Sequence, residues 1–384
     1  MARLRRTLRA WGARPRRPIC SVNCRTGSGR ARAGGRRLKM SPPAAMPPPT
    51  KTRAESSRRY EGESMSVQVE AGNPKLPEVR VNVATPTSPV VGKVVSTRPV
   101  TRGGRKSASF VRHVSFDVSG TPLAKSFRAG QSFGVLPPGT DSRGKPHKLR
   151  LYSLACPSTG DDGQGNVVAT VCKRVLDEHW ENHKLFIGVA SNYICDLQEG
   201  DEALLTGPSG KRFILPENPS DHDYIFFATG TGIAPFRAMV LDLLNQRADA
   251  RIVLIMGSPY TTDLLYDEEF TTWSKEHSNF RYLTAISREY VREEGASKIY
   301  VQERLNTNAD ELVPMLMNPR TLIYVCGIAG MEVGIIRQMA KLLPPEVFGQ
   351  YVTVREGAGP IESLDRKEFG KVVHAGERLF LEVY

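Results

Sequence analysis

The segment from Tyr224 to Leu244 constrains the fold most strongly, because it places an apolar strand, a glycine turn and a helix in direct succession. Tyr224 to Ala228 is an apolar run of strand length, Gly230-Thr231-Gly232 follows it, and Phe236 to Leu244 has helical spacing. Further strand-like runs lie at residues 251–256, 282–286 and 321–325. Alternating strands and helices predict a parallel sheet with crossover helices from about residue 219 onward.

The residues before this point have a different pattern, with short β-rich runs separated by glycine-containing turns. Such runs occur at residues 90–95, 110–118 and 167–172. An antiparallel barrel or sandwich of about 125 residues fits this spacing. The sequence therefore predicts three parts: a tail and linker at 1–88, a barrel domain at 89–218 and an α/β domain at 219–384.

The first 64 residues carry almost all of the net charge. They hold 17 Lys and Arg against 3 Asp and Glu, whereas the remaining residues hold 36 and 37. The tail is rich in Arg, Gly, Pro and Ala and has no apolar periodicity, so we expect it to be disordered. Three interpretations stay open: an organelle transit peptide, a basic arm for nucleic acid or lipid, or untranslated sequence upstream of a start at Met65.

Several classes of protein are excluded by composition and spacing. No apolar run approaches the roughly 18 residues of a membrane-spanning helix, so no membrane span is expected. The six cysteines form no pair of C-x-x-C units, so we expect neither a metal site nor an iron-sulfur cluster. Four thiols in the body do not resemble a disulfide framework, which favours a reducing compartment.

Two segments suggest nucleotide binding. Gly230 to Pro235 joins a strand to a helix, where a pyrophosphate can approach the backbone, although a tight turn needs glycine for structural reasons alone. Ser287-Arg288-Glu289 and Lys298 to Gln302 offer hydroxyl, guanidinium and aromatic groups suited to a 2′-phosphate and an adenine, but a solvated charged loop is the plainer alternative.

Three other features are less specific. Arg150-Leu151-Tyr152-Ser153 has strand alternation and is compatible with an ordinary solvated face. Cys326-Gly327 ends a strand, where open α/β sheets bind ligands, yet a lone buried Cys is usually inert. The apolar, aromatic segment Leu381 to Tyr384 is unusual for a chain end.

Together these motifs resemble the plant-type ferredoxin–NADP reductase family, which also occurs in bacteria. The resemblance covers about residues 90–384 and rests on motifs in a fixed order. They are GKPHKLRLYS (144–153), GVASNYICDL (188–197), TGPSGK (206–211), ATGTGIAPFR (228–237), LLYDEEF (264–270), SRE (287–289), KIYVQ (298–302), YVCGIAGME (324–332) and EVY (382–384).

The resemblance implies a fold and a flavin site. The fold is an antiparallel FAD-binding β-barrel followed by a parallel-sheet NADP-binding α/β domain. Arg150 would pair with the FAD pyrophosphate, with Leu151 in the same binding segment, while Tyr152 would stack on the isoalloxazine and Ser153 would lie near its N5. Backbone donors of Val189, Ala190 and Ser191 would complete the pyrophosphate site, and Tyr384 would stack on the other flavin face and yield to nicotinamide.

The resemblance also implies the NADP(H) site and its selectivity for NADP over NAD. Thr231 would contact the NADP pyrophosphate, and Cys326 would orient the nicotinamide, while Glu382 would move the accompanying proton. The residues that would hold the 2′-phosphoadenosine are Ser287, Arg288, Lys298, Tyr300 and Gln302.

The implied activity is FAD-dependent electron transfer between NADPH and ferredoxin or flavodoxin. The partner would be a small acidic protein, steered by Lys145, Lys148 and Lys173. Two alternatives stay open: the reductase component of an oxygenase system, and a non-catalytic nucleotide-binding protein whose tail binds nucleic acid or lipid. We expect a monomer without a nucleic-acid partner, in a bacterial cytoplasm or, if the tail is a transit peptide, in a plastid.

Two departures from the family pattern are visible. Asp177 stands where plant members carry a tyrosine that stacks on the FAD adenine, and Trp180 is a candidate substitute. The segment between Val354 and Leu381 is longer than in typical members. An extra hairpin or helix near the active site is the expectation for that segment, and the sequence assigns no role to it.

Overall fold

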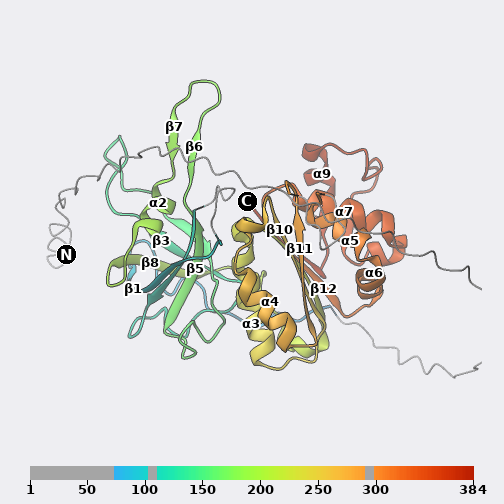
Figure 1. Ribbon diagram of the computed structural model, residues 1–384, viewed down its shortest axis with the longest axis horizontal. Helices are drawn as coiled ribbons and strands as arrows, with labels where there is room; N and C mark the ends of the chain where they lie inside the picture. The colour runs from blue at the N-terminus through green and yellow to red at the C-terminus, as the bar shows by residue number, and fades with distance from the viewer. Residues whose placement is uncertain (1–72, 103–109, 290–297) are drawn as a thin grey trace, which may run out of the picture. The chain divides into compact units, whose positions relative to one another are not determined.

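A computed structural model describes residues 73–102, 110–289 and 298–384 of the chain (Figure 1). The basic tail, Cys20, Cys24 and the alternative start at Met65 lie outside the described residues, so the expectations about them stay predictions.

The first part of the described chain is an antiparallel sheet of six strands in the order β4-β3-β8-β1-β2-β5. Its strands are β1 (Val90–Pro99), β2 (Val111–Asp117), β3 (Ser132–Leu136), β4 (Arg150–Ser153), β5 (Val167–Lys173) and β8 (Glu202–Ser209). The two edge strands approach each other, because Ala155 N–H donates to Ala169 O at 2.8 Å and Thr170 Oγ1 donates to Ser153 O at 2.8 Å. The sheet therefore curls into a barrel-like form, as the alternating pattern predicts.

The barrel core contains the apolar side chains that alternate along these strands. Phe116 of β2 and Phe133 of β3 make an edge-to-face contact with their ring centroids 5.9 Å apart. The helix α2 (Val189–Asp196) covers this core with Ile194 and Cys195. A hairpin of β6 (Leu176–Glu178) and β7 (Leu185–Ile187) precedes the helix.

The second sheet is parallel and has five strands in the order β11-β10-β9-β12-β15. Its strands are β9 (Asp223–Thr229), β10 (Ile252–Ser258), β11 (Phe280–Ile286), β12 (Thr321–Gly327) and β15 (Leu379–Val383). The helical segments around it are η1 (Pro219–Asp221), η2 (Gly230–Gly232), α3 (Ile233–Asn245), η3 (Thr261–Asp263), α4 (Asp267–Glu276), η5 (Val301–Glu303), α5 (Arg304–Thr307), α6 (Ala309–Met317), α7 (Met331–Leu342), α8 (Pro345–Phe348) and α9 (Arg366–Val372).

Helices cover both faces of this sheet, and β9 shows why. Tyr224 and Phe226 belong to one apolar cluster together with side chains of α3 and α4, whereas Ile225 and Phe227 belong to another with side chains of α6 and α7. Successive residues of a strand point to opposite faces, so a strand covered on both sides must be apolar throughout. The continuous apolar run of β9 is therefore the sequence signature of this doubly covered sheet.

The strand order places a switch point between β9 and β12. The chain moves outward from β9 to β10 and β11, then returns to build β12 on the other side of β9. Open α/β sheets bind ligands where the carboxyl ends of two such strands diverge. The backbone is crowded here: a Cβ placed on Gly232 would lie 2.3 Å from Cys326 O, so the turn after β9 accepts only glycine at this position.

The longer segment before β15 has its own small structure. Strand β13 (Val352–Val354) pairs antiparallel with β14 (Val373–Ala375), and α9 lies between them in the chain. Asp365 caps α9, because its carboxylate accepts hydrogen bonds from the N–H groups of Lys367 and Glu368. The strand pair and the helix agree with the extra hairpin or helix expected in this segment, although the sequence did not give their limits.

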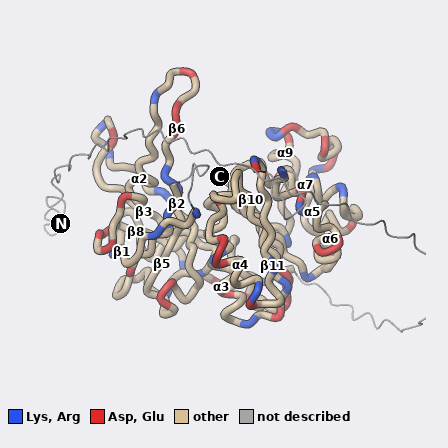
Figure 2. The backbone as a smooth tube through the Cα atoms, in the orientation of Figure 1, with Lys and Arg blue, Asp and Glu red and all other residues tan. Residues whose placement is uncertain are grey.

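Charges of both signs are interspersed over the described chain, in agreement with its nearly equal basic and acidic counts (Figure 2). Within the described ranges, every helix is too short or too polar to cross a membrane. The predicted fold class, an antiparallel barrel followed by a parallel α/β sheet, is confirmed.

Candidate active site

Thr231 lies in η2, the turn that connects the central strand β9 to α3. Its Oγ1 shares a hydrogen bond of 2.7 Å with the hydroxyl of Tyr384. No side chain caps α3, and the Gly232 N–H also contacts the Tyr384 hydroxyl. Thr231, the predicted contact for the NADP pyrophosphate, and Tyr384, the ring predicted to stack on the flavin, are therefore in direct contact.

Cys326 and Glu382 lie side by side near the carboxyl ends of two neighbouring strands. They are register partners on the neighbouring strands β12 and β15. Beyond them, Tyr384 N–H donates to Gly327 O at 3.0 Å, and Ala329 N–H donates to Tyr384 O at 2.9 Å. These backbone bonds hold Tyr384 in place although its side chain is 63% exposed.

Burial changes the protonation of both groups. It raises the pKa of Glu382 to about 7. Oε2 of this carboxylate is buried and has no hydrogen-bond partner among the described residues. Burial, and then the nearby Glu382, raise the pKa of the Cys326 thiol well above its usual value, so this thiol stays protonated. The site therefore combines a neutral thiol with a carboxyl group that can exchange a proton near neutral pH.

The predicted flavin-binding residues of β4 lie on the barrel. Arg150 and Leu151 are exposed, and Tyr152 and Ser153 are partly buried. Among the residues that the structure describes, the Arg150 guanidinium makes one hydrogen bond, a long one of 3.3 Å to the neighbouring Leu149 O. That charge is therefore available for an anion.

Val189, Ala190 and Ser191 form the first turn of α2. Their N–H groups have no acceptor within their own helix, and Gly188 provides no side-chain cap. The Ser191 hydroxyl is already used, because it accepts from Val175 N–H and donates to Gly188 O, each at 3.2 Å. The backbone donors of this turn, more than the hydroxyl, can therefore hold an anion.

Strand β5 connects the two groups of predicted residues. Thr170 on β5 hydrogen-bonds to Ser153 O, and η2 with Thr231 lies against β5. The structure thus brings the serine of the barrel and the glycine turn of the α/β sheet to the two sides of one strand.

The predicted 2′-phosphate residues follow the carboxyl end of β11. Ser287 N–H donates to Ser258 O and Arg288 N–H to Pro259 O, both at 3.0 Å, which fixes this loop against the end of β10. Arg288 and Tyr300 have exposed side chains. The Gln302 side chain lies against α7 at Gly334, and Lys298 begins the described chain after residues 290–297, which lie outside it.

A buried polar network that the sequence did not assign connects the barrel to the α/β sheet. Arg237 of α3 donates to Ala155 O at 2.6 Å and pairs with Asp161 at 3.3 Å and with Glu269 at 2.8 Å. His113 of β2 contacts Asp161 at 2.7 Å. Burial alone would raise the pKa of Asp161, but its bond to His113 and the charges of His113 and Arg237 lower it to about 2.

The signal for this network was present in the motifs. Arg237 ends ATGTGIAPFR, and Glu269 lies in LLYDEEF together with Tyr266, whose hydroxyl is 2.7 Å from His113 Nδ1. The motifs contain these residues, but the sequence alone does not show that they contact the barrel.

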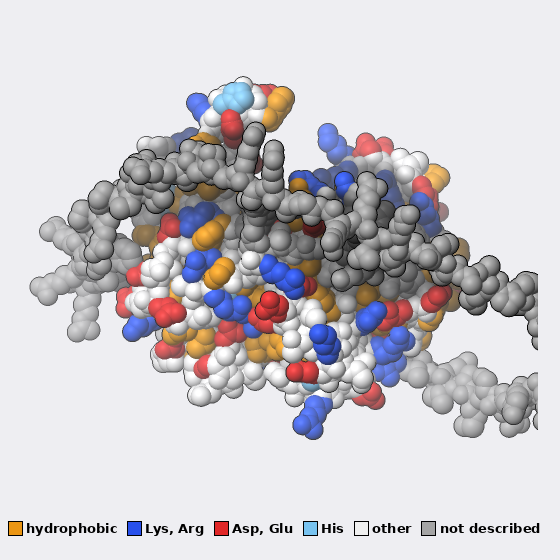
Figure 3. Space-filling view, viewed as in Figure 1, with side chains coloured by type: hydrophobic (Ala, Val, Ile, Leu, Met, Phe, Trp, Pro, Cys, Tyr) orange, Lys and Arg blue, Asp and Glu red, His pale blue; other side chains and the backbone are white. Residues whose placement is uncertain are grey.

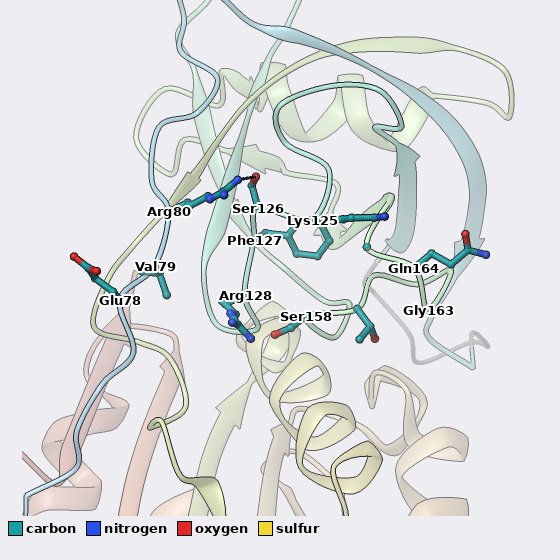
Figure 4. A pocket seen from close by; sticks show the side chains of 12 residues that line it. Glu78, Val79, Arg80, Lys125, Ser126, Phe127, Arg128, Ser158, Gly163 and Gln164 are labelled. Carbon is teal, nitrogen blue, oxygen red and sulfur yellow. Dashed lines mark hydrogen bonds between the residues drawn. The ribbon is translucent and has the colours of Figure 1, made fainter.

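A cavity of about 400 Å³ lies apart from these residues (Figure 4). It is lined by the extended segment at residues 78–80 and by the loops at 125–128 and 158–165, including Arg80, Lys125 and Arg128. None of the predicted site residues lines it.

The β6–β7 hairpin carries the departures at the predicted adenine site. Asp177 is on β6, and Trp180, in the connecting loop, is 81% exposed. Leu185, Phe186 and Ile187 of β7 are exposed as well, and Figure 3 shows apolar side chains at the tip of the protruding hairpin. An exposed aromatic side chain is therefore available near the predicted adenine position, although its contact with adenine stays a prediction.

Comparisons with known proteins agree with this geometry. Residues 226–336 match the family described as the oxidoreductase NAD-binding domain. The chain is 40% identical over 269 residues to ferredoxin–NADP reductase of Spirulina sp, covering 68% of this chain and 90% of the relative. It is 34% identical over 343 residues to the chloroplastic leaf isozyme 1 of ferredoxin–NADP reductase of Arabidopsis thaliana. This match covers 88% of this chain and 84% of the relative.

A comparison with solved structures shows the same fold. The structure of ferredoxin–NADP⁺ reductase from Plasmodium falciparum with 2′P-AMP superposes with a TM-score of 0.58 at 20% sequence identity, covering 80% of this chain and all of that one. Fold and site thus define a two-part oxidoreductase with a nucleotide-binding α/β sheet. Within that class, the chain belongs to the ferredoxin–NADP reductase family.

Proposed function

We propose that this protein transfers electrons between NADPH and ferredoxin with FAD as its bound cofactor. One observation carries the assignment of the site: Thr231, Cys326, Glu382 and Tyr384 meet at the switch point, beside the barrel strand that contacts Ser153. The domain limits at 89–218 and 219–384 are part of the proposal.

The residues present fit a flavin dinucleotide. Arg150 and the first-turn N–H groups of α2 offer positive charge and donors to a pyrophosphate. Tyr152 offers a partly buried ring to the isoalloxazine, with Leu151 exposed beside it, and the partnerless Oε2 of Glu382 suits a polar group of the bound cofactors. When bound, the flavin accepts a hydride and releases electrons singly, which matches a two-electron donor to a one-electron carrier.

The side chains at the switch point have separate roles in this proposal. Cys326 stays a neutral thiol and orients the nicotinamide. Glu382, with its pKa near neutrality, holds or releases the accompanying proton. Tyr384 covers the reaction position and keeps Thr231 occupied until a nicotinamide nucleotide displaces it.

NADP(H) selection is assigned to the loop after β11 and the segment that follows. The groups proposed to hold the 2′-phosphoadenosine are Ser287, Arg288, Lys298, Tyr300 and Gln302. An exposed guanidinium and an exposed aromatic ring suit a phosphate and an adenine.

The proposed partner is a small acidic carrier, ferredoxin or flavodoxin. Lys145, Lys148 and Lys173 are exposed on the barrel and suit an acidic surface. We propose that the chain acts as a monomer, which light scattering of the purified protein tests. A bacterial cytoplasm is the proposed location, with a plastid as the alternative if residues 1–64 are a transit peptide.

The deciding experiment is a visible absorption spectrum of the purified protein before and after anaerobic NADPH, and then NADH. A yellow protein that NADPH bleaches far more efficiently than NADH supports the proposal. Addition of ferredoxin should then accelerate NADPH oxidation; no acceleration would favour a dedicated oxygenase partner. A colourless protein that binds no added FAD would refute the flavin assignment.

A further inference from the structure

Two of the four cysteines that the structure describes lie against each other between β5 and α2. Cys172 and Cys195 are 2% and 3% exposed, and Cys195 Sγ lies 3.6 Å from Cys172 O. Each thiol also shifts the pKa of the other, which agrees with their closeness. Cys156 and Cys326 are free and buried as well, but neither has a second thiol among the groups that influence it.

The surroundings make the two thiols of the pair unequal. The neighbouring Cys172 thiol, and then the positive charges of Arg174 and Arg112, lower the pKa of Cys195, whereas the Cys195 thiol and burial raise the pKa of Cys172. Arg174 is held in place by Asn192 and Asp196 at 2.7 and 2.6 Å. Cys195, beside these guanidinium groups, is therefore the thiol of the pair that ionises more readily.

The pair also touches the proposed flavin site. Cys172 Sγ lies 3.8 Å from Ser191 O in the first turn of α2, and its thiol is among the groups that raise the pKa of Tyr152. A chemical change at Cys172 therefore reaches two of the residues assigned to the flavin.

We propose that Cys172 and Cys195 form a peroxide-sensitive dithiol that closes reversibly to a disulfide. The Cys195 thiolate attacks hydrogen peroxide and takes up one oxygen as a sulfenic acid, and the first water leaves. The Cys172 thiol then attacks the sulfenic sulfur, which forms the S–S bond and releases the second water. Two thiols are oxidised while one peroxide is reduced to two waters, and an added dithiol reductant reverses the change.

Burial does not exclude this reaction. Hydrogen peroxide is small and uncharged, so a brief local opening of the short helix α2 is enough to admit it. The neighbouring Cys156 lies in the same apolar core without a thiol partner, which provides a matched control.

The test exposes the full-length protein to hydrogen peroxide, alkylates the remaining thiols and maps disulfides by peptide mass spectrometry. The expected product is a Cys172–Cys195 peptide pair that disappears after reduction. It should persist in Cys156→Ser and be lost in Cys172→Ser and Cys195→Ser. Absence of this pair in the wild-type protein would overturn the proposal, and this result does not depend on any variant folding.

The order of attack has its own readout. In Cys172→Ser, a sulfenic-acid probe should label Cys195, because no resolving thiol is present. In Cys195→Ser, Cys172 should stay unlabelled. Labelling confined to Cys172 would overturn the assignment of Cys195 as the attacking thiol.

The coupling to the flavin rests on the proposed function. Because disulfide formation moves Cys172 Sγ away from Ser191 O and changes the surroundings of Tyr152, we expect the oxidised protein to release FAD several-fold faster, measured by the rise of free flavin fluorescence. Unchanged release would refute the coupling. A protein that forms the disulfide but never binds FAD would refute the proposed function and leave the dithiol intact.

Discussion

At the scale of single residues, Glu382 shows how burial prepares a group for chemistry. Its carboxylate has a buried oxygen with no partner among the described residues, so the charged form is disfavoured. A structure selected for stability alone would place a neutral or paired group here. The position of this carboxyl beside Cys326 therefore supports the proposal that it holds and releases a proton.

Replacing Glu382 by Gln should change how stability depends on pH. The carboxyl has its folded pKa raised from 4.5 to about 7, so the wild-type folded state loses stability as pH rises from about 4.5 to 7. With a discount for partial exposure, the loss is about 2 kcal/mol. Thermal unfolding should therefore occur at a higher temperature in Glu382→Gln than in the wild type at pH 8, with little difference at pH 5. The exposed Glu362→Gln is the control, and equal midpoints at pH 8 would contradict this view.

Tyr384 permits a comparison of ring and hydroxyl. In Tyr384→Phe the bonds to Thr231 and to the Gly232 N–H are lost, so Thr231 becomes available and NADP⁺ should bind about threefold to tenfold more tightly. Tyr384→Ser removes the ring too and should raise NADH use relative to NADPH. Calorimetric titration and steady-state kinetics measure the two effects. An unchanged NADP⁺ affinity in Tyr384→Phe would show that the hydroxyl bond does not oppose binding.

At the scale of elements, sequence pattern predicted the strands and helices that bury apolar faces. The run from Tyr224 to Ala228 and the strand at 321–325 were recognisable because doubly covered strands are apolar throughout. For the β13–β14 pair and α9 only an extra hairpin or helix was expected, without limits, because three-residue strands and a seven-residue helix carry too few residues to show a period. The periodicity of apolar residues therefore identifies long, buried elements more readily than short, exposed ones.

A substitution in the loop after β11 tests the predicted preference for NADPH over NADH. Arg288→Ala should raise the KM for NADPH at least tenfold and leave the KM for NADH nearly unchanged, because only NADPH carries the 2′-phosphate. Arg143→Ala, an exposed arginine on a barrel loop, is the matched control. An equal rise in KM for both coenzymes would show that Arg288 does not contact the 2′-phosphate.

At the scale of the whole molecule, the residues that join the two sheets were the hardest to predict. The sequence motifs contain Arg237 and Glu269, but their contacts with the barrel depend on packing between segments more than 70 residues apart. The same limit applies to the candidate site. Motifs predicted its members, whereas the hydrogen bond between Thr231 and Tyr384, 153 residues apart in sequence, emerged only from the fold.

Loss of the Arg237 guanidinium should weaken the connection between the sheets. Arg237→Ala leaves Asp161 and Glu269 without their shared cation in a largely buried setting, so we expect destabilisation of about 3 kcal/mol. Thermal unfolding together with hydrogen exchange at Ala155 and in α3 measures this. Arg143→Ala should leave both unchanged. If the thermal unfolding midpoint of Arg237→Ala equals that of the wild type, the network does not stabilise the connection between the two sheets.

The position of β15 at the edge of its sheet has a consequence for inactivation. An edge strand has a ladder partner on only one side, here β12, and such strands fray before the centre of a sheet opens. Glu382 is on this strand and Tyr384 follows it. On heating, β15 with Glu382 and Tyr384 would therefore separate from β12 while most of the protein stays folded. Activity would then be lost some degrees below the temperature at which the whole protein unfolds.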